Sequence, residues 1–154
     1  MVRILFYQPE IPPNTGNAIR LAANTGCQLH LVEPLGFRFE DKHLRRAGLD
    51  YHDLADVHVH PDLDSAWQAL LPAKVYAFSA TATRWYTDVA YQPEDVLLFG
   101  PESAGLPPAV QDAPEVTDRV RVPMRPGVRS LNLANTAAIA VFEAWRQQGF
   151  ADGV

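Results

Sequence analysis

Three loops rich in proline and glycine carry the side chains of this chain that could do chemistry. The first is PEIPPNTGN (residues 9–17), the second is GPESAGLPP (residues 100–108), and the third runs from Val122 to Ser130. Tight loops present backbone N–H and C=O groups with little side-chain bulk, and the free N–H groups of a helix start bind polar ligands. The loops therefore predict backbone-rich recognition of a flat, polar ligand, with a capped surface turn as the structural alternative for the third loop.

Few charged side chains accompany these loops. Glu102 is the only charge of the second loop, and Arg125 and Arg129 flank the turn of the third. Arg20 lies in the helix that is expected to follow the first loop. It is either a solvated helix charge or a group directed back over that loop.

The net charge of -5 argues against broad, non-specific nucleic-acid binding, which usually needs an excess of Lys and Arg. Any RNA surface would therefore have to be local. Two basic clusters could provide one, although a charge cluster is more often a solvated face. Their members are Lys42, His43, Arg45 and Arg46 in the first cluster and Arg119, Arg121, Arg125 and Arg129 in the second.

Several other chemistries lack the residues that they need. No Gly-x-Gly-x-x-Gly follows the first expected strand and no Walker-type lysine follows a glycine loop, so nicotinamide and triphosphate cofactors are unsupported. Cys27 is the one cysteine, and no Cys/His spacing resembles a zinc site. His58 and His60 share a face of an expected strand, but no third ligand is evident, so no metal is predicted. The apolar runs are too short for a signal peptide or membrane span, which predicts a cytoplasmic protein without membrane contact.

The elements that position the loops alternate between strand and helix. A chain of 154 residues, 47% of them hydrophobic, is expected to form a single domain over residues 1–154. The alternation predicts an α/β fold with a mainly parallel six-stranded sheet and helices on both faces. Ligands on such sheets bind at the carboxyl ends of strands, where the second loop, the third loop and the segment after Phe78 lie. The expected strands are 2–7, 28–33, 57–60, 74–79, 96–99 and 119–122, and the expected helices are 15–24, 41–47, 62–71, 107–112 and a long one after Ser130.

Helix ends and faces can also be predicted. Asn14 is the expected N-cap of the first helix and Gly26 its C-terminal stop, Gly48 ends the short basic helix, and Ser130 stands at the N-cap of the last helix. Apolar residues at three- and four-residue steps predict that one face of the last helix packs on the core. They are Leu131, Ala134, Ala138, Val141, Phe142 and Trp145.

Three stretches resemble the sequence motifs of a known enzyme class. They are PEIPPNTGNAIRLAANTG (9–26), LLFGPESAGLP (97–107) and RVPMRPGVRSLNLANTAAIAVFEAWRQ (121–147). They look like the three motifs of the SPOUT class of S-adenosylmethionine-dependent RNA 2′-O-methyltransferases. With DKHLRRAGLDYH (41–52) between them, the chain resembles specifically the small bacterial tRNA wobble-nucleotide (cytidine/uridine) 2′-O-methyltransferases, from Ile4 to Gln147.

The resemblance implies methylation of the ribose 2′-OH of the wobble nucleotide, cytidine or modified uridine at tRNA position 34. It also implies a deep C-terminal trefoil knot, a homodimer, the tRNA anticodon arm as partner, S-adenosylmethionine as methyl donor, and no metal. The rival interpretations are a 2′-O-methyltransferase of another tRNA or rRNA nucleotide and a non-catalytic knotted RNA-binding protein. The presence of Arg20, Glu102 and Asn132 argues against the non-catalytic protein.

The resemblance also assigns roles to individual residues. The reacting hydroxyl falls beside Arg20, with Asn14 beneath it, as the expected catalytic residues. The donor pocket falls on Phe78, Gly100, Glu102, Val122, Ser130 and Leu131. The basic clusters then supply the RNA contacts, which are expected from Lys42, Arg45, Arg46, Arg125, Arg129 and Asn132.

Two residues depart from the usual pattern of the family. The third motif commonly reads Ser-Leu/Met-Asn-Leu-Ser-Asn, whereas Ala134 stands here for the second serine. Phe142 stands where a tyrosine is common near the middle of the helix. Any contribution of those two hydroxyl groups to RNA binding or dimerisation is therefore missing in this chain.

Overall fold

The computed structural model describes residues 1–46 and 56–154, with every side chain in those ranges except that of Arg45. A 3-10 helical turn, Tyr86–Asp88, follows the fifth strand. The strands are β1 (Arg3–Tyr7), β2 (Gln28–Val32), β3 (Val57–His60), β4 (Val75–Phe78), β5 (Arg84–Trp85), β6 (Val96–Phe99) and β7 (Asp118–Arg121). The helices are α1 (Pro12–Thr25), α2 (Lys42–Arg46), α3 (Leu63–Leu70), α4 (Pro108–Gln111) and α5 (Leu133–Gln147).

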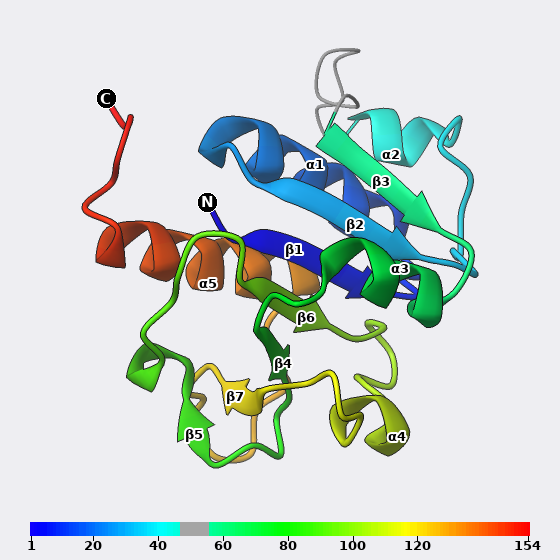
Figure 1. Ribbon diagram of the computed structural model, residues 1–154. Coiled ribbons are helices and arrows are strands. Elements are labelled where there is room, and N and C mark those ends of the chain that lie inside the picture. The colour runs from blue at the N-terminus through cyan, green and yellow to red at the C-terminus, as the bar shows by residue number, and fades with distance from the viewer. Residues whose placement is uncertain (47–55) are drawn as a thin grey trace.

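The described strands form one sheet of seven, in the order β3-β2-β1-β6-β4-β7-β5, and their pairings are all parallel (Figure 1). The parallel sheet was predicted, but the count of six was wrong by one. The additional strand is β5, where Arg84 and Trp85 pair with Val120 and Arg121 of β7. Both residues of β5 are exposed, so this edge strand has no apolar alternation by which the sequence could reveal it.

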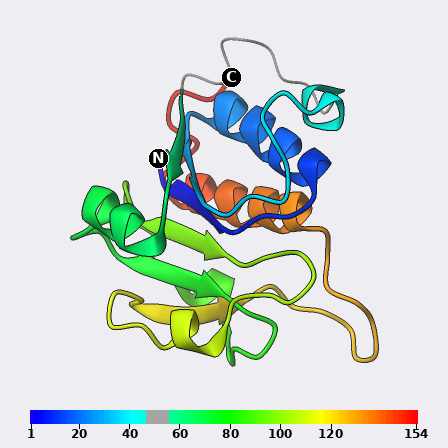
Figure 2. The ribbon, with the colours of Figure 1, turned by 90° about the vertical axis from the view of Figure 1, so that its right-hand side faces the viewer.

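Helices cover both faces of the sheet, with α1 and α5 on one face and α3 and α4 on the other (Figures 1 and 2). Neighbouring residues of a strand point to opposite faces, so Leu97 of β6 belongs to the core under α1 and α5 and Leu98 to the core under α3 and α4. All four residues of β6 are buried. A strand that is covered on both faces has a continuous run of apolar residues in its sequence. The predicted bounds of β6 match the structure for this reason.

Helix α1 begins earlier than predicted. Its first residue is Pro12 and its N-cap is Ile11, so Asn14 is not the cap but lies inside the first turn. Proline is tolerated at a helix start because the first N–H groups have no partner within the helix. The predicted stop at Gly26 is confirmed, since this glycine ends α1 in the left-handed conformation, with φ 77°. Gly48, the predicted end of α2, lies outside the described residues.

Helix α5 begins at Leu133, and its N-cap is Asn132 and not Ser130. The Asn132 side-chain oxygen accepts hydrogen bonds from the backbone N–H groups of Ala134, at 2.9 Å, and Asn135, at 3.2 Å. An asparagine side chain satisfies two of the donors that a helix start leaves unpaired. The segment between β7 and α5 is therefore loop up to residue 132.

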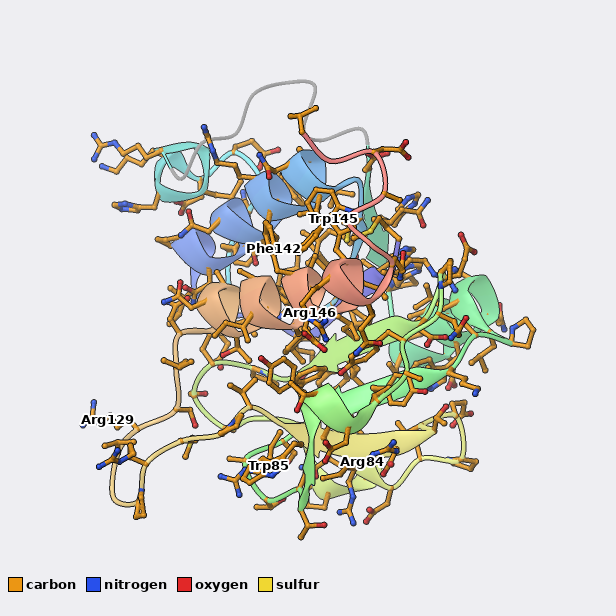
Figure 3. All side chains as sticks on the ribbon, turned by 90° about the vertical axis from the view of Figure 1, so that its left-hand side faces the viewer. Arg84, Trp85, Arg129, Phe142, Trp145 and Arg146 are labelled. Atoms are coloured by element: carbon orange, nitrogen blue, oxygen red, sulfur yellow. The ribbon has the colours of Figure 1, made fainter. Side chains whose placement is uncertain are left out.

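The buried face of α5 differs in part from the predicted one. Leu131 and Phe142 are 51% and 42% exposed, and the Phe142 ring meets the Trp145 ring edge-on at 5.6 Å on the outer side of the helix (Figure 3). Small side chains take the inner positions, which lets α5 pack closely on α1. The buried residues are Ala134, Ala137, Ala140, Val141 and Ala144.

Three histidines stack where β2 meets β3. The His30 ring stacks on His58, with centroids 4.6 Å apart, and on His60, at 5.2 Å, so the two β3 histidines do share a face as predicted. A hydrogen bond of 2.9 Å joins His30 Nδ1 and His60 Nε2. Burial first, and then the neighbouring His58 and His60, lowers the pKa of His30 to about 3. Within residues 1–46 and 56–154, no three His, Cys, Asp or Glu side chains are arranged to hold a metal ion.

The stack predicts a pH-dependent stability. Because the pKa of His30 falls from 6.5 in the unfolded chain to about 3 in the fold, the unfolded chain binds the extra proton between these values. The free energy of unfolding should therefore decrease as the pH falls from 7 towards 4, by up to ~1.4 kcal/mol per pH unit from this group.

Chemical denaturation of the wild type and His30→Phe across this pH range measures the effect. The variant should show the shallower pH dependence, whereas His43→Gln, at an exposed position of α2, should follow the wild type. Equal slopes in wild type and His30→Phe would contradict the prediction.

Candidate functional site

A cavity of about 530 Å³ opens at the carboxyl ends of β4, β6 and β7. This is the edge of a parallel sheet at which ligands bind, and the volume is within the range of small-molecule sites. Four chain segments form most of its wall, to which Gln111 and Thr136 add single residues. The four segments are residues 78–81 after β4, 99–106 after β6, 121–124 after β7, and 130–133 at the start of α5.

The structure brings the predicted donor-binding residues together in this wall. The loop residue Asn132, predicted to contact RNA, also lines the cavity, whereas Arg20 and Asn14 do not. Polar backbone, two aromatic rings and one carboxylate thus surround a single space. The predicted donor-binding residues that line it are Phe78, Gly100, Glu102, Val122, Ser130 and Leu131.

The Glu102 carboxylate joins the second loop to the first. Its Oε1 accepts from the backbone N–H of Glu10 at 2.9 Å, and its Oε2 accepts from the backbone N–H of Ile11 at 2.6 Å and the side-chain amide of Asn14 at 3.2 Å. In return, Glu10 accepts from the backbone N–H and the hydroxyl of Ser103, at 3.1 and 2.7 Å. These hydrogen bonds, led by the hydroxyl, hold the pKa of the Glu10 carboxyl below its usual value.

Asn14 joins the first loop to the third. The side-chain amide of Asn132 donates to the side-chain oxygen of Asn14 at 2.7 Å, and Asn14 is only 5% exposed. Arg20 lies six positions further along α1, roughly 9 Å at 1.5 Å per residue, and is exposed. The structure therefore gives Asn14 a linking role, and leaves Arg20 accessible to a ligand outside the cavity.

Gly100 permits a close approach within the second loop. A Cβ at this position would collide with the backbone of Gly105 and Leu106. The obstacle is the loop's own backbone, so any side chain here would deform the cavity wall. Glycine is the residue that allows this packing.

Those predicted RNA-binding cations whose side chains the structure describes lie outside the cavity. Lys42 and Arg46 are exposed on α2, and the side chain of Arg45 is outside the described part of the structure. Arg125 and Arg129 are exposed on the loop between β7 and α5, which extends away from the body of the molecule (Figures 2 and 3). No salt bridge joins Lys42, Arg46, Arg125 or Arg129 to another described residue.

Arg121 is a cavity residue that the sequence did not single out as one, although it was counted in the second basic cluster. Its Nη1 donates to the carbonyl of Ala82 at 3.5 Å, and its Cζ lies 5.8 Å from the centroid of the Trp85 ring. Its Nε is buried without a partner among the described residues. The alternation of side chains along β7 could have identified Arg121 as a cavity residue. Val120 points into the core, so its neighbour Arg121 points to the opposite face of the sheet.

Comparison with known proteins identifies the family. Residues 1–142 match the SpoU rRNA methylase family. A tRNA (cytidine(34)-2'-O)-methyltransferase of Polaromonas sp. (strain JS666) is 55% identical over 157 residues, which cover 98% of this chain and 93% of the relative. A solved structure from work on the 2-OH methylation of C/U34 on tRNA is 42% identical, with a TM-score of 0.88 and 97% of each chain covered.

A further solved structure carries a bound ligand. The AdoMet-bound rRNA methyltransferase of Sinorhizobium meliloti is 27% identical with a TM-score of 0.80, and the match covers 94% of this chain and 56% of that one. The resemblance carried by the three motifs is thus confirmed, and the chain belongs to the SpoU rRNA methylase family.

Proposed function

We propose that this protein transfers a methyl group from S-adenosylmethionine to the ribose 2′-OH of the wobble nucleotide of tRNA, a cytidine or modified uridine at position 34. The observation that carries the proposal is the identity of 55% over 98% of the chain with a relative named for this reaction. The cavity at the carboxyl edge of the sheet supports it, because the motif residues meet there. A tRNA substrate in turn supports a cytoplasmic location.

The cavity suits S-adenosylmethionine in size and in chemistry. Backbone groups of the second and third loops offer hydrogen bonds to an adenine edge, and Phe78 and Leu131 offer apolar surface. When bound, this donor supplies a methyl group on a positively charged sulfur, which is already activated. The protein's task is then to align the acceptor oxygen and to help it lose its proton, and this requires no metal.

Arg20 would act on the acceptor hydroxyl. An arginine stays protonated in proteins, so it is a poor proton acceptor and acts as a fixed cation. Its exposed guanidinium on α1 would bind the phosphate beside the target ribose and stabilise negative charge developing on the 2′-oxygen. The proton of the hydroxyl would pass to water or to a phosphate oxygen.

The reaction can be tested directly. Purified protein, S-adenosylmethionine and an anticodon stem-loop should give a 2′-O-methylated wobble nucleotide by mass spectrometry, and a stem-loop with a 2′-deoxy wobble nucleotide should give none. Methylation of a different tRNA or rRNA nucleotide would favour the rival substrate. Binding of both ligands without product would favour a non-catalytic RNA-binding protein.

Arg20→Ala should lose on the order of a hundredfold or more in single-turnover rate, the scale of one preorganised electrostatic contact, with donor affinity retained. Arg20→Lys should recover only part of the rate, because a point charge cannot reproduce a bidentate contact. Near-normal turnover in Arg20→Ala would remove this arginine from the mechanism. Full activity in Arg20→Lys would keep the charge but discard the bidentate contact.

The exposed cations outside the cavity should bind the anionic anticodon arm of tRNA. Replacing Lys42 and Arg46 together, or Arg125 and Arg129 together, should weaken tRNA binding and reduce the log-log salt slope by about one for each phosphate that is no longer neutralised. Lys74→Ala is the matched control, since Lys74 is exposed at the opposite, amino end of β4. Binding isotherms at several salt concentrations measure the slope, and an unchanged slope in both double variants would assign these residues to a solvated face.

The outer face of α5 and the turn that follows it support a homodimer. Phe142 and Phe150 are 42% and 47% exposed, and each ring meets Trp145 edge-on with centroids 5.6 Å apart (Figure 3). A contiguous exposed aromatic cluster marks a surface that another molecule covers. We infer that a second copy of this chain covers it.

Phe142→Glu should therefore reduce the mass in solution from dimer to monomer, because it places an unpaired charge in the buried contact. Light scattering measures the mass. Val128→Glu adds the same charge at a side chain that is 55% exposed on the loop before α5, and should stay dimeric. A wild type that is already monomeric at micromolar concentration would refute the dimer.

We further infer a single domain over residues 1–154 and a trefoil knot near its C-terminus. Both core clusters share one sheet, which supports the single domain, and one cooperative unfolding transition would test it. The chain passes from β7, next to the edge strand β5, through a loop to α5, which packs against α1 and β6, and this path is consistent with threading. An experimental structure in which residues 121–133 can be traced past residues 79–100 would test the knot.

No helix within the described residues has the length and apolarity to cross a membrane.

A further inference from the structure

We propose that Arg121 binds the carboxylate of the methyl donor's methionine group, and that Trp85 positions its guanidinium for this contact. The inference rests on the proposed function, because it takes S-adenosylmethionine as the ligand of the cavity. It adds a residue that chooses between donors with and without a carboxylate.

The charges in the cavity wall point to Arg121. Among the described residues that line the cavity, the charged ones are Glu102 and Arg121. Glu102 already accepts three N–H groups from the first loop, with both of its oxygens engaged. The charge left for a ligand is therefore the guanidinium, whose fork of donors matches a carboxylate.

Arg121 also lacks the partners that its neighbours have. Arg84 on β5 pairs with Asp118 at 2.6 Å, and Arg119, two residues before Arg121 on β7, pairs with Asp112 at 3.6 Å. Arg121 makes no salt bridge within the described residues, and its one side-chain hydrogen bond there has the long distance of 3.5 Å. A guanidinium offers five N–H donors, so most of its hydrogen-bonding capacity remains for a ligand.

Trp85 gives this arginine a fixed support that consumes no donor. The ladder of β5 and β7 pairs Trp85 with Arg121, and the ring centroid lies 5.8 Å from Cζ. Such a contact attracts the cation through the ring face and leaves the N–H groups free. This accounts for a tryptophan that is 44% exposed on a polar edge strand, beside Arg84 (Figure 3).

Calorimetry with two probes tests the contact without any turnover. The probes are S-adenosylhomocysteine and its decarboxylated form, which keeps the amino group and lacks only the carboxylate. Wild type should bind S-adenosylhomocysteine about ten- to a hundredfold more tightly than the decarboxylated form, the scale of a hydrogen bond to a charged group. Arg121→Ala should lose that preference, because it should weaken the binding of S-adenosylhomocysteine and leave the binding of the decarboxylated form unchanged.

Companion variants separate the direct contact from its support. Arg121→Lys should keep part of the preference, Trp85→Ala should reduce it, and Trp85→Phe should restore it, because a phenyl face still attracts the cation. Arg119→Ala is the matched control, since Arg119 lies on the same strand and already has a carboxylate partner. Its preference should equal that of the wild type.

The outcomes distinguish the two proposals. If Arg121→Ala keeps the preference of the wild type, or weakens the binding of both probes equally, the proposed carboxylate contact is refuted. An unchanged preference together with a smaller salt slope for tRNA binding would assign Arg121 to an RNA phosphate instead. If the wild type binds neither probe, the proposed function itself fails, whatever Arg121 does.

Discussion

The site depends on the Glu102 carboxylate, because this group holds the first loop against the second. Its two oxygens accept from the consecutive backbone N–H groups of Glu10 and Ile11, one oxygen for each N–H group. The two residues that follow are prolines, which carry no N–H. Glu102 thus engages the last free donors before α1, at the end of the helix where its dipole favours negative charge.

The other loop contacts follow from this one. Asn14 donates to Glu102 and accepts from Asn132, which in turn caps α5. The starts of both helices and the second loop are therefore linked through part-buried hydrogen bonds of the Asn14 side chain. Because α1 and α5 also pack on each other through small side chains, the exposed Arg20 has a fixed position relative to the cavity. A rigid support of this kind is what precise alignment of two reactants requires.

Sequence reasoning succeeded where burial dictates residue type and failed where it does not. The strand β6 has apolar residues on both faces, so its bounds could be predicted, whereas β5 is two exposed residues with no buried side chain to mark it. On α5 one apolar face packs on the core as predicted, but of the predicted residues only Ala134 and Val141 are buried, and Phe142 and Trp145 meet on the outer face. Spacing cannot tell a core from a contact surface, because both bury apolar area. The links from Asn14 to Glu102 and Asn132 cross long stretches of chain, and no local pattern encodes them.

The distribution of ion pairs explains how an acidic chain can present a surface for an anion. Four arginines away from the loops are paired with carboxylates among the described residues, whereas Lys42, Arg46, Arg125 and Arg129 are not. The pairs are Arg3 with Glu94, Arg84 with Asp118, Arg119 with Asp112 and Arg146 with Glu143. Salt screens exposed charges beyond about 8 Å at physiological ionic strength, so a polyanion responds to the charges near its contact and not to the net charge. The net charge of -5 therefore does not by itself exclude an anionic partner.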